Sequence, residues 1–188
     1  MVAYAESASD VHRWSPEEYH RLVESGALDE LRVELIDGFI VDMSPTSPAH
    51  DYAIQWLNHA IVPMLDVRRH RIRVNSSLSL GASEPMPDIA VIPVDVEAPW
   101  HPGGAALAIE VAHSSLRRDL KVKPRIYAEA DIRRYWVVDL DRRRAVTHEG
   151  ARPGGYEHVE TVGEAGTLSA PEVGVSVSLS ELLAFAIR

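Results

Sequence analysis

Three acidic residues stand inside segments that are otherwise strongly apolar, and this feature constrains the chain more than any other. Glu34 lies in Val-Glu-Leu-Ile, Asp88 begins Asp-Ile-Ala-Val-Ile, and Glu110 lies in Leu-Ala-Ile-Glu-Val-Ala. Each segment has the length and the content of branched side chains that a buried strand shows. An unpaired buried carboxylate costs several kcal/mol, so each acid needs a partner. Three converging carboxylates would also repel one another, which favours a shared hard divalent cation.

Simpler explanations exist for any one of these acids taken alone. Strand alternation could turn the side chain toward solvent, or an arginine could pair with it. The three acids in this order favour the functional interpretation over both alternatives.

Local signals predict helices alternating with strands and a central mixed sheet flanked by helices, which is an α/β fold. Caps at Ser15, Ser47 and Ser180 and the turn pair Asp37-Gly38 mark several boundaries. The predicted helices cover residues 16–24, 48–64, 119–130 and 181–186. The predicted strands cover residues 32–36, 39–43, 72–80, 88–92, 106–111, 135–139, 144–148 and 156–162. We expect a single domain over residues 1–188, with its core at about 13–183.

Composition excludes several classes of protein and leaves others open. The chain has 188 residues and no cysteine, which excludes thiolate zinc sites. Its net charge of −9 counts mildly against tight DNA binding. No apolar run approaches the roughly 18 residues of a membrane span, and no secretory signal is visible. We therefore expect a cytoplasmic protein without membrane association.

The ordered motifs resemble those of one known family. Glu34, Pro87-Asp88 and Glu110-Val111-Ala112 resemble the E…PD…(D/E)XK signature of the restriction-endonuclease-like superfamily. Longer strings resemble the bacterial Uma-two family of restriction endonucleases over residues 13 to 183, nearly the whole chain. These strings are Glu34-Leu35-Ile36-Asp37-Gly38, Met43-Ser44-Pro45, Ser47-Pro48-Ala49-His50, Glu110 to Ser114, Asp119 with Lys123 and Tyr127, and Tyr135 to Asp139.

The resemblance implies a restriction-endonuclease-like core and a role for each motif residue. Asp88 and Glu110 would bind Mg²⁺, or Mn²⁺ in its place, with the backbone carbonyl of Val111 as a further ligand. Glu34 would bind the ion or its water shell. The implied activity is hydrolysis of DNA, and by analogy such enzymes often work as homodimers.

One position departs from the superfamily signature. The lysine of EXK should stand at 112, where this chain has alanine, and the resembling family supplies it from the next helix. Asp119, Lys123 and Tyr127 recur every four residues and share one helical face, so Lys123 is the expected catalytic lysine. Only Lys121 and Lys123 are lysines among nineteen Lys and Arg residues, and Lys121 points elsewhere. Pro124 requires either a helix that begins near 121 or a kink.

Several other residues keep two interpretations. The basic run from Arg68 to Arg73 could bind phosphates or form a solvated face. His50 and His113 could contact phosphate or be structural, and Tyr127 could serve the site or the core. Trp100 to Gly104 is expected to form a mobile loop, with a role as a substrate-facing lid left open.

The sequence therefore predicts a Mg²⁺-dependent endonuclease built on Glu34, Asp88, Glu110 and Lys123. Two alternatives stay open. A catalytically inactive binding module with the same fold would explain the acidic net charge and the missing EXK lysine. A hydrolase of small phosphoesters would use the same metal chemistry without affinity for DNA.

Overall fold

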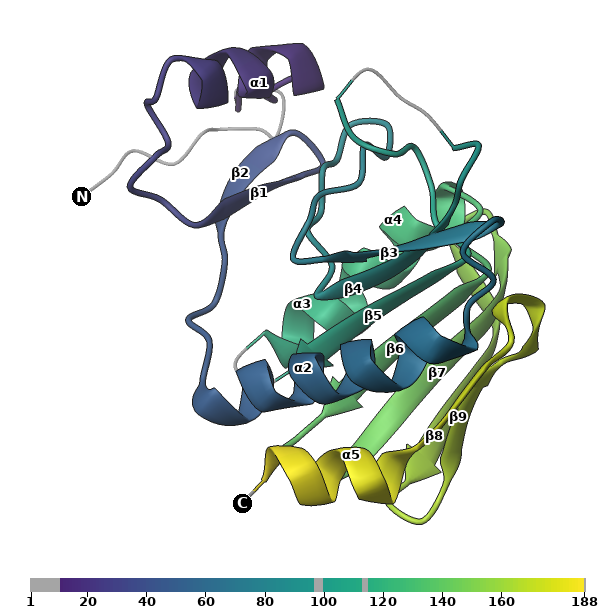
Figure 1. Ribbon diagram of the computed structural model, residues 1–188. Helices are drawn as coiled ribbons and strands as arrows, with labels where there is room; N and C mark the ends of the chain where they lie inside the picture. The colour runs from purple at the N-terminus through teal and green to yellow at the C-terminus, as the bar shows by residue number, and fades with distance from the viewer. Residues whose placement is uncertain (1–10, 97–99, 113–114, 188) are drawn as a thin grey trace.

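A six-stranded mixed sheet forms the centre of the computed structural model, which describes residues 11–96, 100–112 and 115–187 (Figure 1). The strand order is β3-β4-β5-β6-β7-β8, and every neighbouring pair is antiparallel except β5 and β6. The strands are β3 His70–Val74, β4 Ile89–Pro93, β5 Leu107–Ala112, β6 Arg134–Asp139, β7 Arg144–Arg152 and β8 Gly155–Gly163. The expected central mixed sheet is confirmed.

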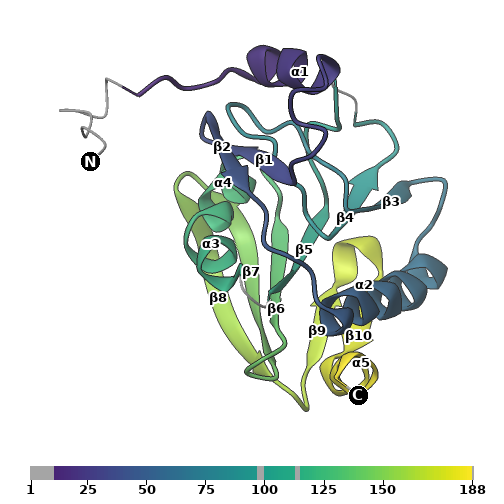
Figure 2. The same ribbon diagram turned by 90° about the vertical axis from the view of Figure 1, so that its left-hand side faces the viewer.

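Helices cover both faces of this sheet, as Figure 2 shows. On one side lie α3 (Leu116–Lys121) and α4 (Lys123–Glu129). On the other side lie α2 (Pro48–Ile61), α5 (Leu179–Ala186) and the small sheet of β9 (Thr167–Ala170) with β10 (Val175–Ser178). Strands buried on both faces are continuously apolar, which explains why β5 and β6 show so little alternation in sequence.

The alternation of β5 decides where its acid points. Leu107, Ile109 and Val111 pack into the apolar core beneath α2 and α5. Ala108 and Ala112 pack into the second core beneath α3 and α4. Successive side chains of a strand point to opposite faces, so Glu110 lies on the α3–α4 side between these two small alanines.

A smaller unit of α1 (Pro16–Glu24) and the hairpin of β1 (Val33–Ile36) and β2 (Phe39–Asp42) stands beside the sheet (Figure 1). The hairpin turn has positive φ at both Asp37 and Gly38, as the turn pair predicts. Backbone hydrogen bonds join the unit to the segment before β4: Gly38 N–H to the Ala82 carbonyl at 2.9 Å and Glu84 N–H to the Leu35 carbonyl at 2.7 Å.

Several boundaries predicted from the sequence are wrong. The strand expected over residues 72–80 is His70–Val74, because Asn75 takes a left-handed conformation with φ of 46° and ends it. The helix expected over 119–130 is divided into α3 and α4, and helix α2 ends at Ile61 before a 3-10 turn, Val62–Met64.

The cap of the last helix was also misplaced. Ser178 precedes α5 and its hydroxyl accepts the Glu181 N–H, whereas the sequence suggested Ser180. Strands β9 and β10 are additional to the strands predicted from the sequence. Among the described residues, no helix has both the length and the apolar character to span a membrane.

Candidate active site

Glu34, Asp88 and Glu110 converge on one cavity, although they come from β1, from the residue before β4 and from β5. All three are at least nine-tenths buried. The Val111 N–H donates to Asp88 Oδ2 at 2.7 Å, which fixes the aspartate against β5. The Met86 N–H donates to Glu34 Oε2 at 3.2 Å. The sequence thus predicted the meeting of these acids.

Lys123 lines the same cavity and is only 3% exposed. Its Nζ lies 2.8 Å from Glu110 Oε1, 3.2 Å from Glu34 Oε2 and 3.7 Å from Asp119 Oδ1. The Tyr127 hydroxyl donates to the same Glu110 oxygen at 2.8 Å. The helix after β5 therefore places an ammonium beside the acids, where the EXK lysine was missing at Ala112.

A break between α3 and α4 makes this placement possible. Val122 separates the two helices with φ of −112° and ψ of −57°, and Pro124 stands in the first turn of α4. Proline is tolerated there because the first N–H groups of a helix have no intrahelical partner. Lys121 precedes the break and is exposed, so only Lys123 reaches the acids.

Asp119 is a fourth buried acid at the same place. The Ser115 hydroxyl donates to its Oδ2 at 2.5 Å, and the Tyr135 hydroxyl donates to its backbone carbonyl at 2.8 Å. Within the described part of the chain, Asp119 Oδ1 is buried without a hydrogen-bond partner. This oxygen contacts Lys123 Nζ in an ion pair at 3.7 Å.

Burial and charge shift the protonation equilibria of this group. Burial raises the pKa of Glu110 well above its ordinary value, opposed by Lys123. Burial likewise raises the pKa of Asp119, again opposed by Lys123. Burial alone would lower the pKa of Lys123, but Glu110, Glu34 and Asp119 together raise it. Lys123 is charged, because the carboxylates of Glu110, Glu34 and Asp119 surround its ammonium.

His50 is the residue of the first turn of α2 that reaches the acids. Its Nε2 lies 3.2 Å from Asp88 Oδ1, and its Nδ1 lies 3.3 Å from Asp51 Oδ1. Burial would lower the pKa of His50, but the hydrogen bonds to Asp88 and Asp51 raise it above its ordinary value. Of the two interpretations left open for His50, the structure favours a place in the site.

Arg118 was not singled out from the sequence. Its Nη1 donates to Glu34 Oε1 at 3.1 Å and to the Asp42 carbonyl at 2.9 Å, and its side chain is 26% exposed. It therefore links β1, β2 and α3 at the mouth of the cavity. No sequence motif distinguishes Arg118, and an arginine on a helix is ordinarily solvated, so the sequence offers no reason to place it in the site.

Other candidates lie elsewhere. His113 falls outside the described residues, so its role stays a prediction. The basic run around β3, an edge strand, and the loop from Trp100 to Gly104 do not line the cavity. Tyr127 serves both of the roles that were left open, since it is fully buried in the core and bonds Glu110.

Two comparisons with known proteins bear on the family and the fold. The family model for Uma2, described as "Putative restriction endonuclease", matches residues 16–182. The chain belongs to the Uma2 family. Among solved structures, this Uma2 protein resembles a "putative nuclease belonging to DUF820 from Anabaena variabilis ATCC 29413", with a TM-score of 0.69 and 14% sequence identity. The match covers 84% of this chain and 93% of the other, and at this identity it shows a common fold.

No curated protein matches the chain. The family and the fold nonetheless place this Uma2 protein among nuclease-like α/β proteins with a restriction-endonuclease-like core.

The donor set fits a hard divalent cation. Glu34, Asp88, Glu110 and Asp119 supply four carboxylates to the cavity, and Lys123, Arg118 and Arg32 supply three permanent positive charges. Carboxylate and carbonyl oxygens are the ligands that Mg²⁺ and Mn²⁺ prefer. The unpartnered buried oxygen of Asp119 favours a cation at this place.

Proposed function

We propose that this Uma2 protein is a Mg²⁺-dependent endonuclease that hydrolyses phosphodiester bonds of DNA. The observation that carries the proposal is the convergence of Glu34, Asp88 and Glu110 on one cavity, where Lys123 pairs with Glu34 and Glu110. Family membership and the nuclease-like fold support the same reaction class. The fold alone would not support a nuclease activity, because one fold hosts many functions.

Asp88 and Glu110 would hold the ion, with the Val111 carbonyl as a further ligand, and Glu34 would bind it or its water shell. The fixed orientation of Asp88, imposed by the Val111 N–H and His50, supports this assignment. Mg²⁺ bound there would neutralise charge on the scissile phosphate and lower the pKa of an attacking water. Mn²⁺ would serve the same ligands.

Lys123 would act as a charged hydrogen-bond donor. Glu110, Glu34 and Asp119 raise the pKa of Lys123, which favours a charged donor over a general base. A positioned ammonium instead stabilises the negative charge that develops on the phosphate oxygens in the transition state. The carboxylates of Glu34 and Glu110 orient it for that purpose at 3.2 Å and 2.8 Å.

Arg118 and Arg32 would contact the phosphate backbone at the mouth of the cavity, which both line. Guanidinium groups bind phosphate oxygens in a bidentate manner, and a few local contacts suffice for binding in spite of the net charge of −9. The acidic composition thus weakens non-specific coating of DNA without excluding a local interaction.

The proposal is tested by incubating supercoiled plasmid with the purified protein and Mg²⁺ or Mn²⁺. We expect nicked or linear DNA, loss of cleavage in EDTA, and loss in Asp88→Asn. Asp95→Asn is the matched control, since Asp95 is an exposed aspartate in the turn after β4. Cleavage that persists in Asp88→Asn, or that is absent from the wild type with every metal, would contradict the proposal.

Two other outcomes would identify the alternative functions. DNA binding without cleavage, unaffected by Asp88→Asn, would indicate a binding module with a nuclease fold. Hydrolysis of a small model diester such as bis(p-nitrophenyl) phosphate, without any retention of DNA in a mobility-shift assay, would indicate a small-molecule phosphodiesterase.

A further inference from the structure

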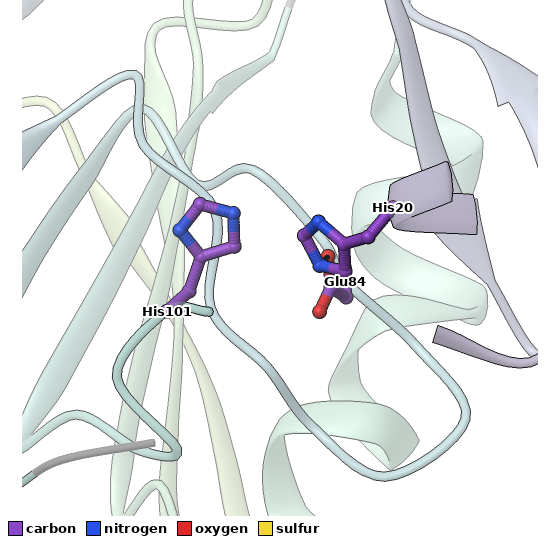
Figure 3. A group of neighbouring side chains, drawn as sticks. All are labelled: His20, Glu84 and His101. Carbon is purple, nitrogen blue, oxygen red and sulfur yellow. Dashed lines mark ion pairs between the residues drawn. The ribbon is translucent and has the colours of Figure 1, made fainter. Parts of the chain in front are cut away.

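A second group of metal-binding side chains lies apart from the acidic cavity. It consists of His20 from α1, Glu84 from the segment before β4 and His101 from the loop before β5. One ligand atom from each residue lies within 4.8 Å of the other two. Figure 3 shows the two imidazoles and the carboxylate gathered around one point. None of the three residues lines the acidic cavity.

The closest contact in this group is not a proper hydrogen bond. His20 Nε2 lies 2.8 Å from Glu84 Oε2, and both residues are buried. Yet within the residues that the structure describes, neither atom has a partner in hydrogen-bond geometry. Burial of polar atoms without a hydrogen bond is unfavourable. A cation that both atoms coordinate would remove that cost.

The surroundings hold Glu84 in the orientation that a ligand needs. The Ser79 hydroxyl donates to Glu84 Oε1 at 2.8 Å, so the other oxygen, Oε2, is turned toward the imidazoles. The Glu84 N–H bonds the Leu35 carbonyl, which fixes the backbone at this point. Outer hydrogen bonds of this kind orient the ligands of metal sites.

Ring stacking and burial also prepare the two histidines for metal binding. The Trp100 indole stacks on the His20 ring at 4.2 Å between centroids and 12° between planes, and the two imidazole centroids lie 5.6 Å apart. Burial lowers the pKa of His101, which favours the neutral imidazole. A neutral ring has the lone pair that metal binding requires.

We infer that His20, Glu84 and His101 form a Zn²⁺ site, with water in the fourth position. Two imidazoles and one carboxylate are a ligand set typical of Zn²⁺, whereas Mg²⁺ prefers oxygen ligands alone. The ion would link α1 to the loop before β5 and to the segment at Glu84, whose backbone hydrogen-bonds β1. Because β1 carries Glu34, this second ion would hold the N-terminal unit, and with it one acid of the cavity, against the sheet.

The test uses untagged full-length protein, stripped with a chelator and titrated with Zn²⁺ in a calorimeter. We expect one equivalent per chain and a melting temperature that rises by several degrees. His101→Ala should weaken binding at least 100-fold and abolish the rise. His158→Ala is the matched control, because His158 is an exposed histidine of β8. A wild type that binds no Zn²⁺, or a His101→Ala variant that binds it unchanged, would overturn the inference.

A second measurement separates this site from the acidic cavity and guards against misfolded variants. Co²⁺ bound by imidazoles gives visible absorption bands, and a paramagnetic ion beside Trp100 should quench its fluorescence. We expect both signals to remain in Asp88→Asn and the bands to disappear in Glu84→Gln, while Trp100→Phe keeps the bands and loses the quenching. Signals that disappear in Asp88→Asn instead would assign the ion to the acidic cavity and overturn the site.

Discussion

Lys123 Nζ lies 2.8 Å from Glu110 Oε1, which joins the first residue of α4 to the centre of β5 across thirteen residues of sequence. Both side chains are almost completely buried. The contact fixes the only buried lysine of the described residues among three carboxylates, and it makes the amine as central to the site as the acids.

Replacement of Lys123 by methionine should therefore abolish cleavage. The variant keeps the length of the side chain but leaves buried carboxylates without their ammonium, which typically costs about 3–5 kcal/mol. We expect a loss of cleavage rate of at least about 100-fold, in the range seen when a transition-state donor is removed. The measurement pairs a plasmid-nicking time course with urea unfolding.

Lys121→Met provides the matched control, since Lys121 is exposed two residues away. It should cleave like the wild type. Equal losses in the two variants would show that Lys123 has no special role. Urea unfolding of Lys123→Met at high Mn²⁺ distinguishes a missing charge from a collapsed site. If only the charge is missing, Mn²⁺ binds and raises the unfolding free energy of the variant, whereas a collapsed site binds no cation.

Glu34→Gln should weaken metal binding without unfolding the protein. Glutamine can still accept the Met86 N–H, but it loses the charge that faces Lys123 and Arg118. Loss of a carboxylate that supports the ion should reduce Mn²⁺ affinity by about 10–100-fold. Calorimetric titration measures this directly, with the exposed Glu30→Gln as control. Unchanged affinity would remove Glu34 from the metal site.

Much of this site could be predicted because its signals are local. Glu34 and Glu110 stand in apolar strands, and exposure to solvent is a poor explanation for all of the acids together. Asp37-Gly38 has the φ preferences of a hairpin turn. Lys123 follows Asp119 by one helical turn, a spacing that is readable in the sequence. Apolar strand patterns singled out Glu34, Asp88 and Glu110, whereas Lys123 was predicted through the family resemblance, with its helical spacing from Asp119 in support.

The remaining features depend on tertiary contacts. Arg118 meets Glu34 across 84 residues, and no local pattern records that pairing. The break at Val122 follows the local signal of Pro124, which requires a new helix start or a kink. Only the folded structure shows that this break brings Lys123 onto Glu110. Strand β3 ends at Val74 because Asn75 takes a left-handed conformation, although its N–H still bonds the carbonyl of Asp88, the residue before β4.

Arg118→Ala should reduce DNA affinity more than metal affinity. Arg118 lies at the mouth of the cavity, so its loss should weaken binding by about 1–3 kcal/mol and lower the slope of log affinity against log salt by about one. Fluorescence anisotropy with catalytically inactive Asp88→Asn as background measures both quantities. Arg152→Ala, an exposed arginine of β7, is the control. An unchanged salt slope would show that Arg118 only orients Glu34.

Gly38→Ala should destabilise the hairpin that carries Glu34. Gly38 has φ of +79°, and a Cβ there would lie 2.9 Å from Arg13 Cβ and 3.1 Å from the Trp14 carbonyl oxygen. Gly81 has φ of +63° with no atom within 4 Å of such a Cβ, so Gly81→Ala measures conformational strain alone. We expect about 1 kcal/mol for the strain at either site and up to about 3 kcal/mol in total for Gly38→Ala. Urea unfolding compares the two variants, and because displacement of β1 moves Glu34, Mn²⁺ affinity should fall in Gly38→Ala only. Equal unfolding free energies would mean that the contacts of Gly38 with Arg13 and Trp14 relax without cost, and the close approach of the N-terminal segment to the turn would then not contribute to holding Glu34 in place.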